Sequence, residues 1–183
     1  NYVASVGVLL VVGILIGGMI GCAEPAQYNL TISSTEGGEI TTPEDDTFSY
    51  DGGTEVPLVA LPHTGYRFVN WTGDVDTIAN VEDASTTIIM NDDYSITANF
   101  VKQYSLTISS TAGGSVAAPG EATYAYDEGE VVNLVAQAEE GYHFVNWTGD
   151  VGTIANTDAA VTSITMATSY IITANFAVDL YFE

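Results

Sequence analysis

The 183-residue chain is poor in positive charge and in cysteine. It has two Lys and Arg residues, Arg67 and Lys102, against 24 Asp and Glu, so its formal net charge is −22. Nucleic acids and anionic lipid head groups are bound through Lys and Arg, so we predict no nucleic-acid partner and no attraction to anionic lipid. Cys22 is the single cysteine, which excludes an intrachain disulfide. Charged residues are only 14% and apolar ones 46%, a composition that indicates a folded chain.

The chain repeats itself. The stretch 65–75, Gly-Tyr-Arg-Phe-Val-Asn-Trp-Thr-Gly-Asp-Val, returns at 141–151 with one change, His143 for Arg67. The same offset holds without a gap from 28–100 to 104–176, and about 40 of the paired positions are identical, which indicates a tandem duplication.

Alternation of apolar and polar residues predicts a mainly β fold, because period two is the pattern of half-buried strands. We expect two small β-rich units, 28–100 and 104–176, joined by a linker at 101–103. A spacer at 23–27 precedes them, and 177–183 reads as the start of a further segment. In the strand that begins at Tyr66, strict alternation would place Tyr66, Phe68 and Asn70 on one face and Arg67, Val69 and Trp71 on the other.

Residues 3–22 are uncharged and largely apolar, long enough for a membrane-spanning helix, so we expect a hydrophobic helix over 1–22. Three interpretations stay open. The run ends in Met-Ile-Gly-Cys, which resembles a bacterial lipoprotein signal with Cys22 as the lipid attachment site. A retained membrane span and a pilin-like filament helix are the others. Each places the following residues outside the cytoplasm, and the opening Asn1 suggests a fragment or a processed form.

The motifs YxLTISSTxGGxV, GYxFVNWTGDVxTIAN and SITANF are each present, fully or nearly so, in both units. With them the sequence resembles the divergent internalin-type B-repeat, also called the bacterial repeat domain. The resemblance implies small β-grasp-like units on a secreted or surface protein, acting as a stalk, a spacer or an adhesion module. It carries no catalytic residues.

The best-kept residues of the repeat are interpreted as a structural signature. We expect the glycines to reverse the chain, the aromatics to fill the core, and the Asp residues to close turns. This signature comprises Gly65, Tyr66, Phe68, Trp71, Gly73, Asp74, Gly141, Tyr142, Phe144, Trp147, Gly149 and Asp150.

Catalytic chemistry is not indicated, because neither histidine recurs in the other unit and no zinc or nucleophile motif is present. We therefore predict no enzyme, no catalytic residues and no cofactor. Calcium is the alternative, since Asp74, Asp76 and the run 91–93 offer carboxylates, although the second unit has lost most of these oxygens.

These observations favour a non-catalytic extracytoplasmic surface protein, anchored in the membrane by its N-terminal segment or by a lipid on Cys22, with the repeats as stalk, spacer or adhesion module. An adhesin whose repeats contact surface glycans or proteins directly is the alternative. A fragment of a larger extracytoplasmic hydrolase is the third hypothesis.

Overall fold

The computed structural model describes residues 24–180. The helix predicted over 1–22, the lipid attachment site Cys22 and the last three residues lie outside the described part. Within residues 24–180 the chain forms thirteen strands and no helix, and this part therefore has no helix that could cross a membrane. The prediction of a mainly β protein with two tandem units is confirmed.

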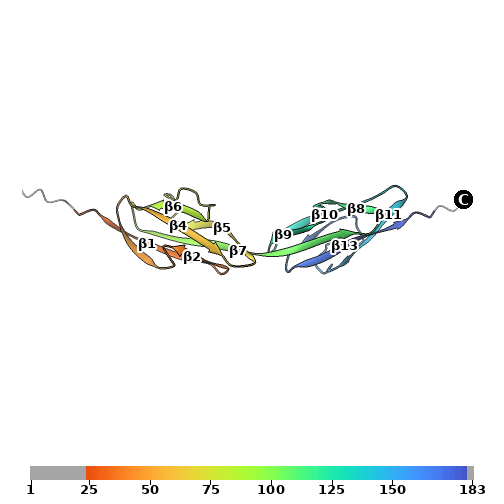
Figure 1. Ribbon diagram of the computed structural model, residues 1–183, viewed down its shortest axis with the longest axis horizontal. Coiled ribbons are helices and arrows are strands. Elements are labelled where there is room, and N and C mark those ends of the chain that lie inside the picture. The colour runs from red at the N-terminus through yellow and green to blue at the C-terminus, as the bar shows by residue number, and fades with distance from the viewer. Residues whose placement is uncertain (1–23, 181–183) are drawn as a thin grey trace, which may run out of the picture.

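The first unit contains six strands of its own: β1 (Gln27–Ser34), β2 (Gly38–Thr42), β3 (Thr47–Asp51), β4 (Glu55–Pro62), β5 (Tyr66–Gly73) and β6 (Ser85–Ile89). The second unit repeats the plan with β8 (Gly114–Ala118), β9 (Thr123–Asp127), β10 (Val131–Ala138), β11 (Tyr142–Gly149), β12 (Val161–Thr165) and β13 (Tyr170–Val178). One long strand, β7 (Tyr94–Ser110), belongs to both units (Figure 1).

Each unit is a sandwich of two sheets. In the first unit, four strands in the order β3-β1-β7-β5 face the three-stranded antiparallel sheet β2-β4-β6. In the second unit, β9-β7-β13-β11 faces β8-β10-β12. The wide sheets are mixed, because β1 pairs with β7, and β7 with β13, in parallel, whereas their other pairings are antiparallel.

The β-grasp-like part of the fold prediction is wrong. A β-grasp unit covers its sheet with a helix, and no helix occurs within residues 24–180. The three-stranded sheet takes that place, because its alternating apolar residues form an apolar face that covers the wide sheet.

A separate apolar core fills each sandwich. In the first unit, side chains at every second position of β1, β4 and β7 point inward around Trp71, which is 1% exposed. The second core has the same plan around Trp147. All buried residues within the described chain are apolar or aromatic. The two cores are formed by Leu30, Ile32, Ile40, Val56, Leu58, Ala60, Trp71, Ile88, Met90, Ile96 and Ala98, and by Leu106, Ile108, Val116, Val132, Leu134, Ala136, Trp147, Ile164, Met166, Tyr170, Ile172 and Ala174.

Residues 101–103, predicted as a linker, lie inside β7. The strand leaves the first core after Ala98 and enters the second at Leu106, and even-numbered side chains face the core in both units. The run Val101-Lys102-Gln103 contains neither Gly nor Pro, so nothing in it interrupts an extended backbone. The two units consequently lie end to end along one continuous strand (Figure 1).

Candidate functional site at the junction of the two units

The signature strand β5 contains a β-bulge. Its register against β7 shifts between Phe68 and Asn70, so Val69 is an extra residue. The bulge moves Trp71 to the same side as Phe68, and their ring centroids lie 5.6 Å apart. Strict alternation had put these two residues on opposite faces, and that prediction is wrong. The same bulge in β11 brings Phe144 within 5.7 Å of Trp147.

The glycine and aspartate that end β5 hold the start of β7. Gly73 has φ of 100°, and a Cβ there would come within 2.2 Å of the Ser95 carbonyl oxygen, so only glycine fits. The Asp74 carboxylate accepts a hydrogen bond from the backbone N–H of Ser95 at 2.9 Å. Asp150 accepts the equivalent bond from Ile171 at 2.9 Å. Each aspartate thus ties the turn after the signature strand to the start of the neighbouring strand.

The junction itself is tied by an ion pair between the units. Arg67, on β5, reaches Asp127, the last residue of β9. Its Nε donates to Oδ1 at 2.8 Å and to Oδ2 at 3.1 Å, and its second terminal nitrogen also donates to Oδ2. Gln103, on β7, adds a longer bond of 3.3 Å to Oδ1. The guanidinium therefore binds the carboxylate through two nitrogens, the geometry that gives such pairs their directionality.

This pair sets the ionisation of both partners. The hydrogen bond from Arg67 lowers the pKa of Asp127 below its ordinary value, against the opposing effect of partial burial. The hydrogen bond to Asp127 raises the pKa of Arg67 in turn. Both groups are consequently charged across the ordinary pH range. The side chains are 46% and 23% exposed, so solvent weakens their attraction.

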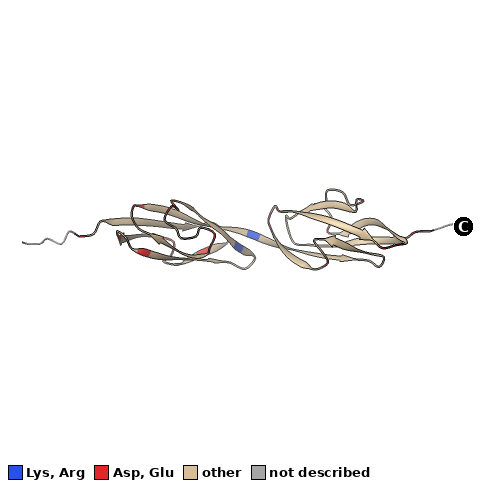
Figure 2. Ribbon diagram, turned by 90° about the horizontal axis from the view of Figure 1, so that it is seen from above, with Lys and Arg blue, Asp and Glu red and all other residues tan. Residues whose placement is uncertain are grey.

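Two backbone bonds and the second cation reinforce the junction. The Gln103 N–H donates to the Gly65 carbonyl at 2.7 Å, and the Glu128 N–H donates to the Lys102 carbonyl at 2.8 Å. The Lys102 ammonium lies 5.1 Å from the Tyr104 ring centroid. Figure 2 shows both positively charged residues of the chain close together where the units meet. In a chain of net charge −22, the positive charge is thus placed where two acidic units must approach each other.

A family model describes both units. The divergent InlB B-repeat domain matches residues 28–103 and again residues 104–179. The chain belongs to the divergent InlB B-repeat family. Repeats of this kind are typical of bacterial cell-surface proteins, which fits an extracytoplasmic location. A search of the curated proteins finds no match to the chain.

The two B-repeats differ at the position that makes the junction. His143 takes the place of Arg67 in the second repeat, and its Nδ1 lies 2.8 Å from Asp179 Oδ1. The Asp179 N–H donates to the Gly141 carbonyl at 2.8 Å, which repeats the bond between Gln103 and Gly65. The end of β13 is thus held by the same backbone bond that holds β7 at Gln103.

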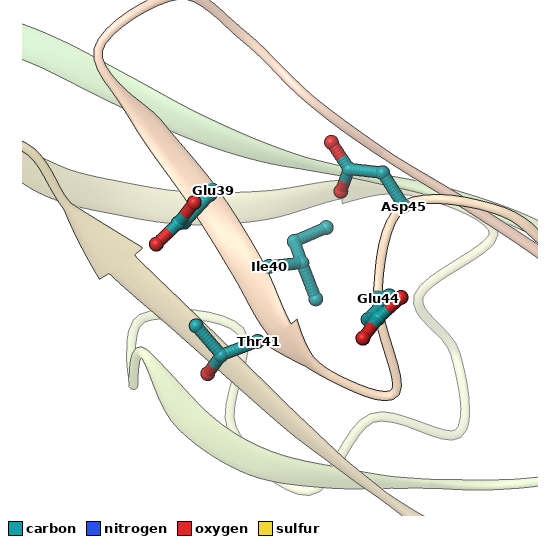
Figure 3. A pocket seen from close by; sticks show the side chains of 5 residues that line it. All are labelled: Glu39, Ile40, Thr41, Glu44 and Asp45. Atoms are coloured by element: carbon teal, nitrogen blue, oxygen red, sulfur yellow. The ribbon is translucent and has the colours of Figure 1, made fainter.

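A hollow of about 440 Å³ opens at the turn after β2 in the first B-repeat. Figure 3 shows the Ile40 side chain between Glu39 on β2 and Glu44 on the turn, with Asp45 beside them. The three carboxylates of this hollow would repel an anion. Within residues 24–180, no group of three or more His, Cys, Asp and Glu side chains is placed to hold a metal ion.

The residues considered for calcium serve the backbone of the first B-repeat. Asp93 accepts a hydrogen bond from the Asn29 N–H at 2.6 Å, and Asp92 accepts one from the Asp93 N–H at 2.8 Å. Asn91 bonds the Tyr94 hydroxyl. Each of these oxygens is thus bonded to a group of the protein.

Sequence reasoning missed the pair of Arg67 and Asp127, although two signals were available. Arg67 is the only arginine, and it stands at the one position where the two copies of the stretch differ. An acid recurs at position 127 and its counterpart 51.

Proposed function

We propose that this protein is a non-catalytic, extracytoplasmic surface protein whose tandem B-repeats act as a stiff spacer anchored to the membrane. The observation that carries the proposal is strand β7, which is at once an inner strand of both wide sheets. A spacer sets a distance only if its units keep their mutual orientation. A shared strand provides this, because bending between the units has to distort paired backbone.

The contacts around the strand support the same role. The pair of Arg67 and Asp127 joins β5 of the first unit to β9 of the second, and the bond between Gln103 and Gly65 joins β7 to the residue before β5. Each is modest alone, since an exposed ion pair contributes about 0.2–1 kcal/mol. The ion pair opposes rotation about the strand axis because it joins a strand of the first unit to a strand of the second, while the Gln103 bond keeps β7 tied to the first unit as far as the junction.

The acidic exterior also suits a spacer. Charges of one sign keep neighbouring copies apart and favour an extended, soluble chain. Repulsion between the two acidic units disfavours collapse of one onto the other. The charge and the shared strand therefore both favour an extended arrangement.

Stiffness can be tested by the distance between the units. In full-length protein carrying Cys22→Ser, spin labels at Asp76→Cys and Gly152→Cys occupy equivalent exposed positions of the two repeats. Double electron–electron resonance should give a single narrow distribution of the distance between the two labels. A two-glycine insertion after Lys102 is the control and should broaden it. A distribution equally broad without the insertion would contradict the spacer proposal.

Anchoring is a separate part of the proposal and has its own test. It is supported by the apolar run that ends in Met19-Ile20-Gly21-Cys22. Metabolic labelling of bacteria with a fatty-acid analogue should label the full-length protein and leave a Cys22→Ser variant unlabelled. Label that persists in the variant would remove Cys22 as the attachment site, while the stiffness result would stand.

A further inference from the structure

The first and last strands of each unit are parallel neighbours. In the first unit β1 pairs with β7 from Leu30 opposite Tyr94 to Ser34 opposite Ala98. In the second unit β7 pairs with β13 from Leu106 opposite Tyr170 to Ser110 opposite Ala174. The chain thus enters and leaves each unit through two strands that are hydrogen-bonded to each other.

This arrangement determines how tension would act on the protein. A pull on the two chain ends draws β1 toward one end of the molecule and β7 toward the other, along the strand axes (Figure 1). Parallel ladders have evenly spaced bonds between their strands. Opposite pulls along the axes therefore load all bonds of the ladder together, in shear, and none can break before its neighbours are strained. The second unit is loaded in the same way, and β7 transmits the tension between the two ladders.

Side chains lengthen both ladders at their ends. After β1, the Thr35 N–H donates to the Ala98 carbonyl at 2.9 Å, and the Thr35 hydroxyl accepts from the Phe100 N–H at 2.9 Å. Thr111 makes the same two bonds to Ala174 and Phe176, each at 2.9 Å.

The other end of each ladder is reinforced in a similar way. In the first unit, Asp93 accepts from the Asn29 N–H at 2.6 Å. In the second unit, the Ser169 hydroxyl accepts from the Ser105 N–H at 3.1 Å. The two units thus use different side chains for the same backbone bond.

Paired hydroxyls also join the strands within each ladder. Ser33 and Thr97 lie 2.9 Å apart, and so do Ser109 and Thr173. Both units therefore place additional bonds on the pair of strands that tension would separate.

We propose that the two repeats bear tension, each acting as a mechanical clamp between its first and last strands. The proposal rests on the proposed spacer role, because a spacer fixed at one end transmits any pull applied at the other. It adds a property that stiffness alone does not imply, namely resistance to unfolding in one direction of pulling.

Single-molecule force spectroscopy tests the direction. Full-length protein carrying Cys22→Ser, in mild detergent, is pulled through peptide handles at its two termini. Two unfolding steps are expected, each releasing about 70 residues, or on the order of 200 Å. A second attachment, through Glu24→Cys and Asp92→Cys, pulls the adjacent ends of β1 and β7 apart and breaks the ladder bond by bond. The first geometry should need a severalfold higher force at the same loading rate. Equal forces would overturn the proposal.

A matched pair of variants tests the side chains. Thr35→Val with Thr111→Val removes one bond from a backbone N–H to a threonine hydroxyl in each clamp. Thr86→Val with Thr162→Val removes the same kind of bond outside the clamps, where these hydroxyls accept from Asn80 and Asn156 at 3.1 and 3.0 Å. Forced unfolding reports the barrier along the pulling direction. The clamp variant should therefore lower the unfolding force more than its control does, for a similar loss of melting temperature.

The outcomes separate the two proposals. If both variants lower the force equally, the clamp is wrong even where the distance between the spin labels is narrow. If that distribution is broad but the force is high and directional, the clamp stands and the stiff spacer fails.

Discussion

Arg67 of the first repeat binds Asp127 of the second through two nitrogens, with Nε 2.8 and 3.1 Å from the two carboxylate oxygens. The residues are sixty positions apart in the chain, and the strand between their units is uninterrupted. The ion pair thus fixes a junction whose backbone is already shared. Replacing one partner should affect orientation more than stability.

The variant Arg67→Ala should broaden the distance distribution between labels at positions 76 and 152 and lower unfolding free energy by no more than about 1 kcal/mol. The physical reason is that the pair is partly solvated, so its loss removes a directional restraint at small energetic cost. Arg67→His, the residue found at position 143, is the matched control and should have an intermediate effect. A loss of several kcal/mol would show that the pair is essential for folding.

The pair should also respond to acid. The pKa of Asp127 is lowered in the folded protein, so its stabilising contribution is complete above the unfolded value of about 3.9 and is lost as pH falls through the folded pKa. The melting-temperature difference between the native chain and Asp127→Asn should therefore shrink below about pH 4. A difference that stays constant into stronger acid would contradict the coupling.

Glu44 has an unfavourable backbone conformation, with φ of 149°. The second repeat has Gly120 at the same place, with φ of 117°. Such an angle destabilises the folded state by about 1–3 kcal/mol when the residue has a side chain. A glycine avoids this strain, but its greater conformational freedom in the unfolded state offsets part of the gain. Glu44→Gly should therefore raise stability by about 1 kcal/mol in chemical denaturation. Gly120→Ala is the reverse control and should lower it, since its Cβ would also lie 2.7 Å from the Tyr124 hydroxyl.

Trp71 should be the most sensitive position of the first core. It is almost completely buried, and its Nε1 donates to the Asp83 carbonyl at 3.0 Å. Trp71→Ala leaves a large cavity and an unpaired carbonyl, so it should cost about 3–5 kcal/mol in denaturant unfolding. Trp147→Ala, the equivalent change in the second core, should cost the same within error. A marked difference between the two would mean that the repeats are not energetically equivalent.

The strands and the duplication could be predicted because they depend on local periodicity. Residues 28–33 alternate apolar and polar side chains, and β1 places Leu30 and Ile32 in the core accordingly. The bulge at Val69 could not be found this way, since alternation counts residues and cannot detect one that the partner strand skips. For that reason Trp71 was assigned to the face opposite Phe68.

The junction was harder to predict because it depends on residues distant in sequence. Val101-Lys102-Gln103 was interpreted as a linker from its position between the repeats, although it contains no turn residue. Arg67 and Asp127 come together only because β5 and β9 each pair with β7, one in each half. That arrangement follows from sheet order, and strand periodicity does not specify sheet order.

Hydrogen exchange at the Gln103 amide tests the shared strand most directly. This N–H donates to the Gly65 carbonyl at 2.7 Å, and Gln103 is the last residue of the run that joins the two repeats. If β7 is one strand shared by both repeats, the Gln103 amide should be protected as well as amides deeper in β7, such as those of Ala98 and Leu106. Exchange at the rate of an unstructured peptide would show instead that a loose linker joins the repeats, which would contradict a continuous β7.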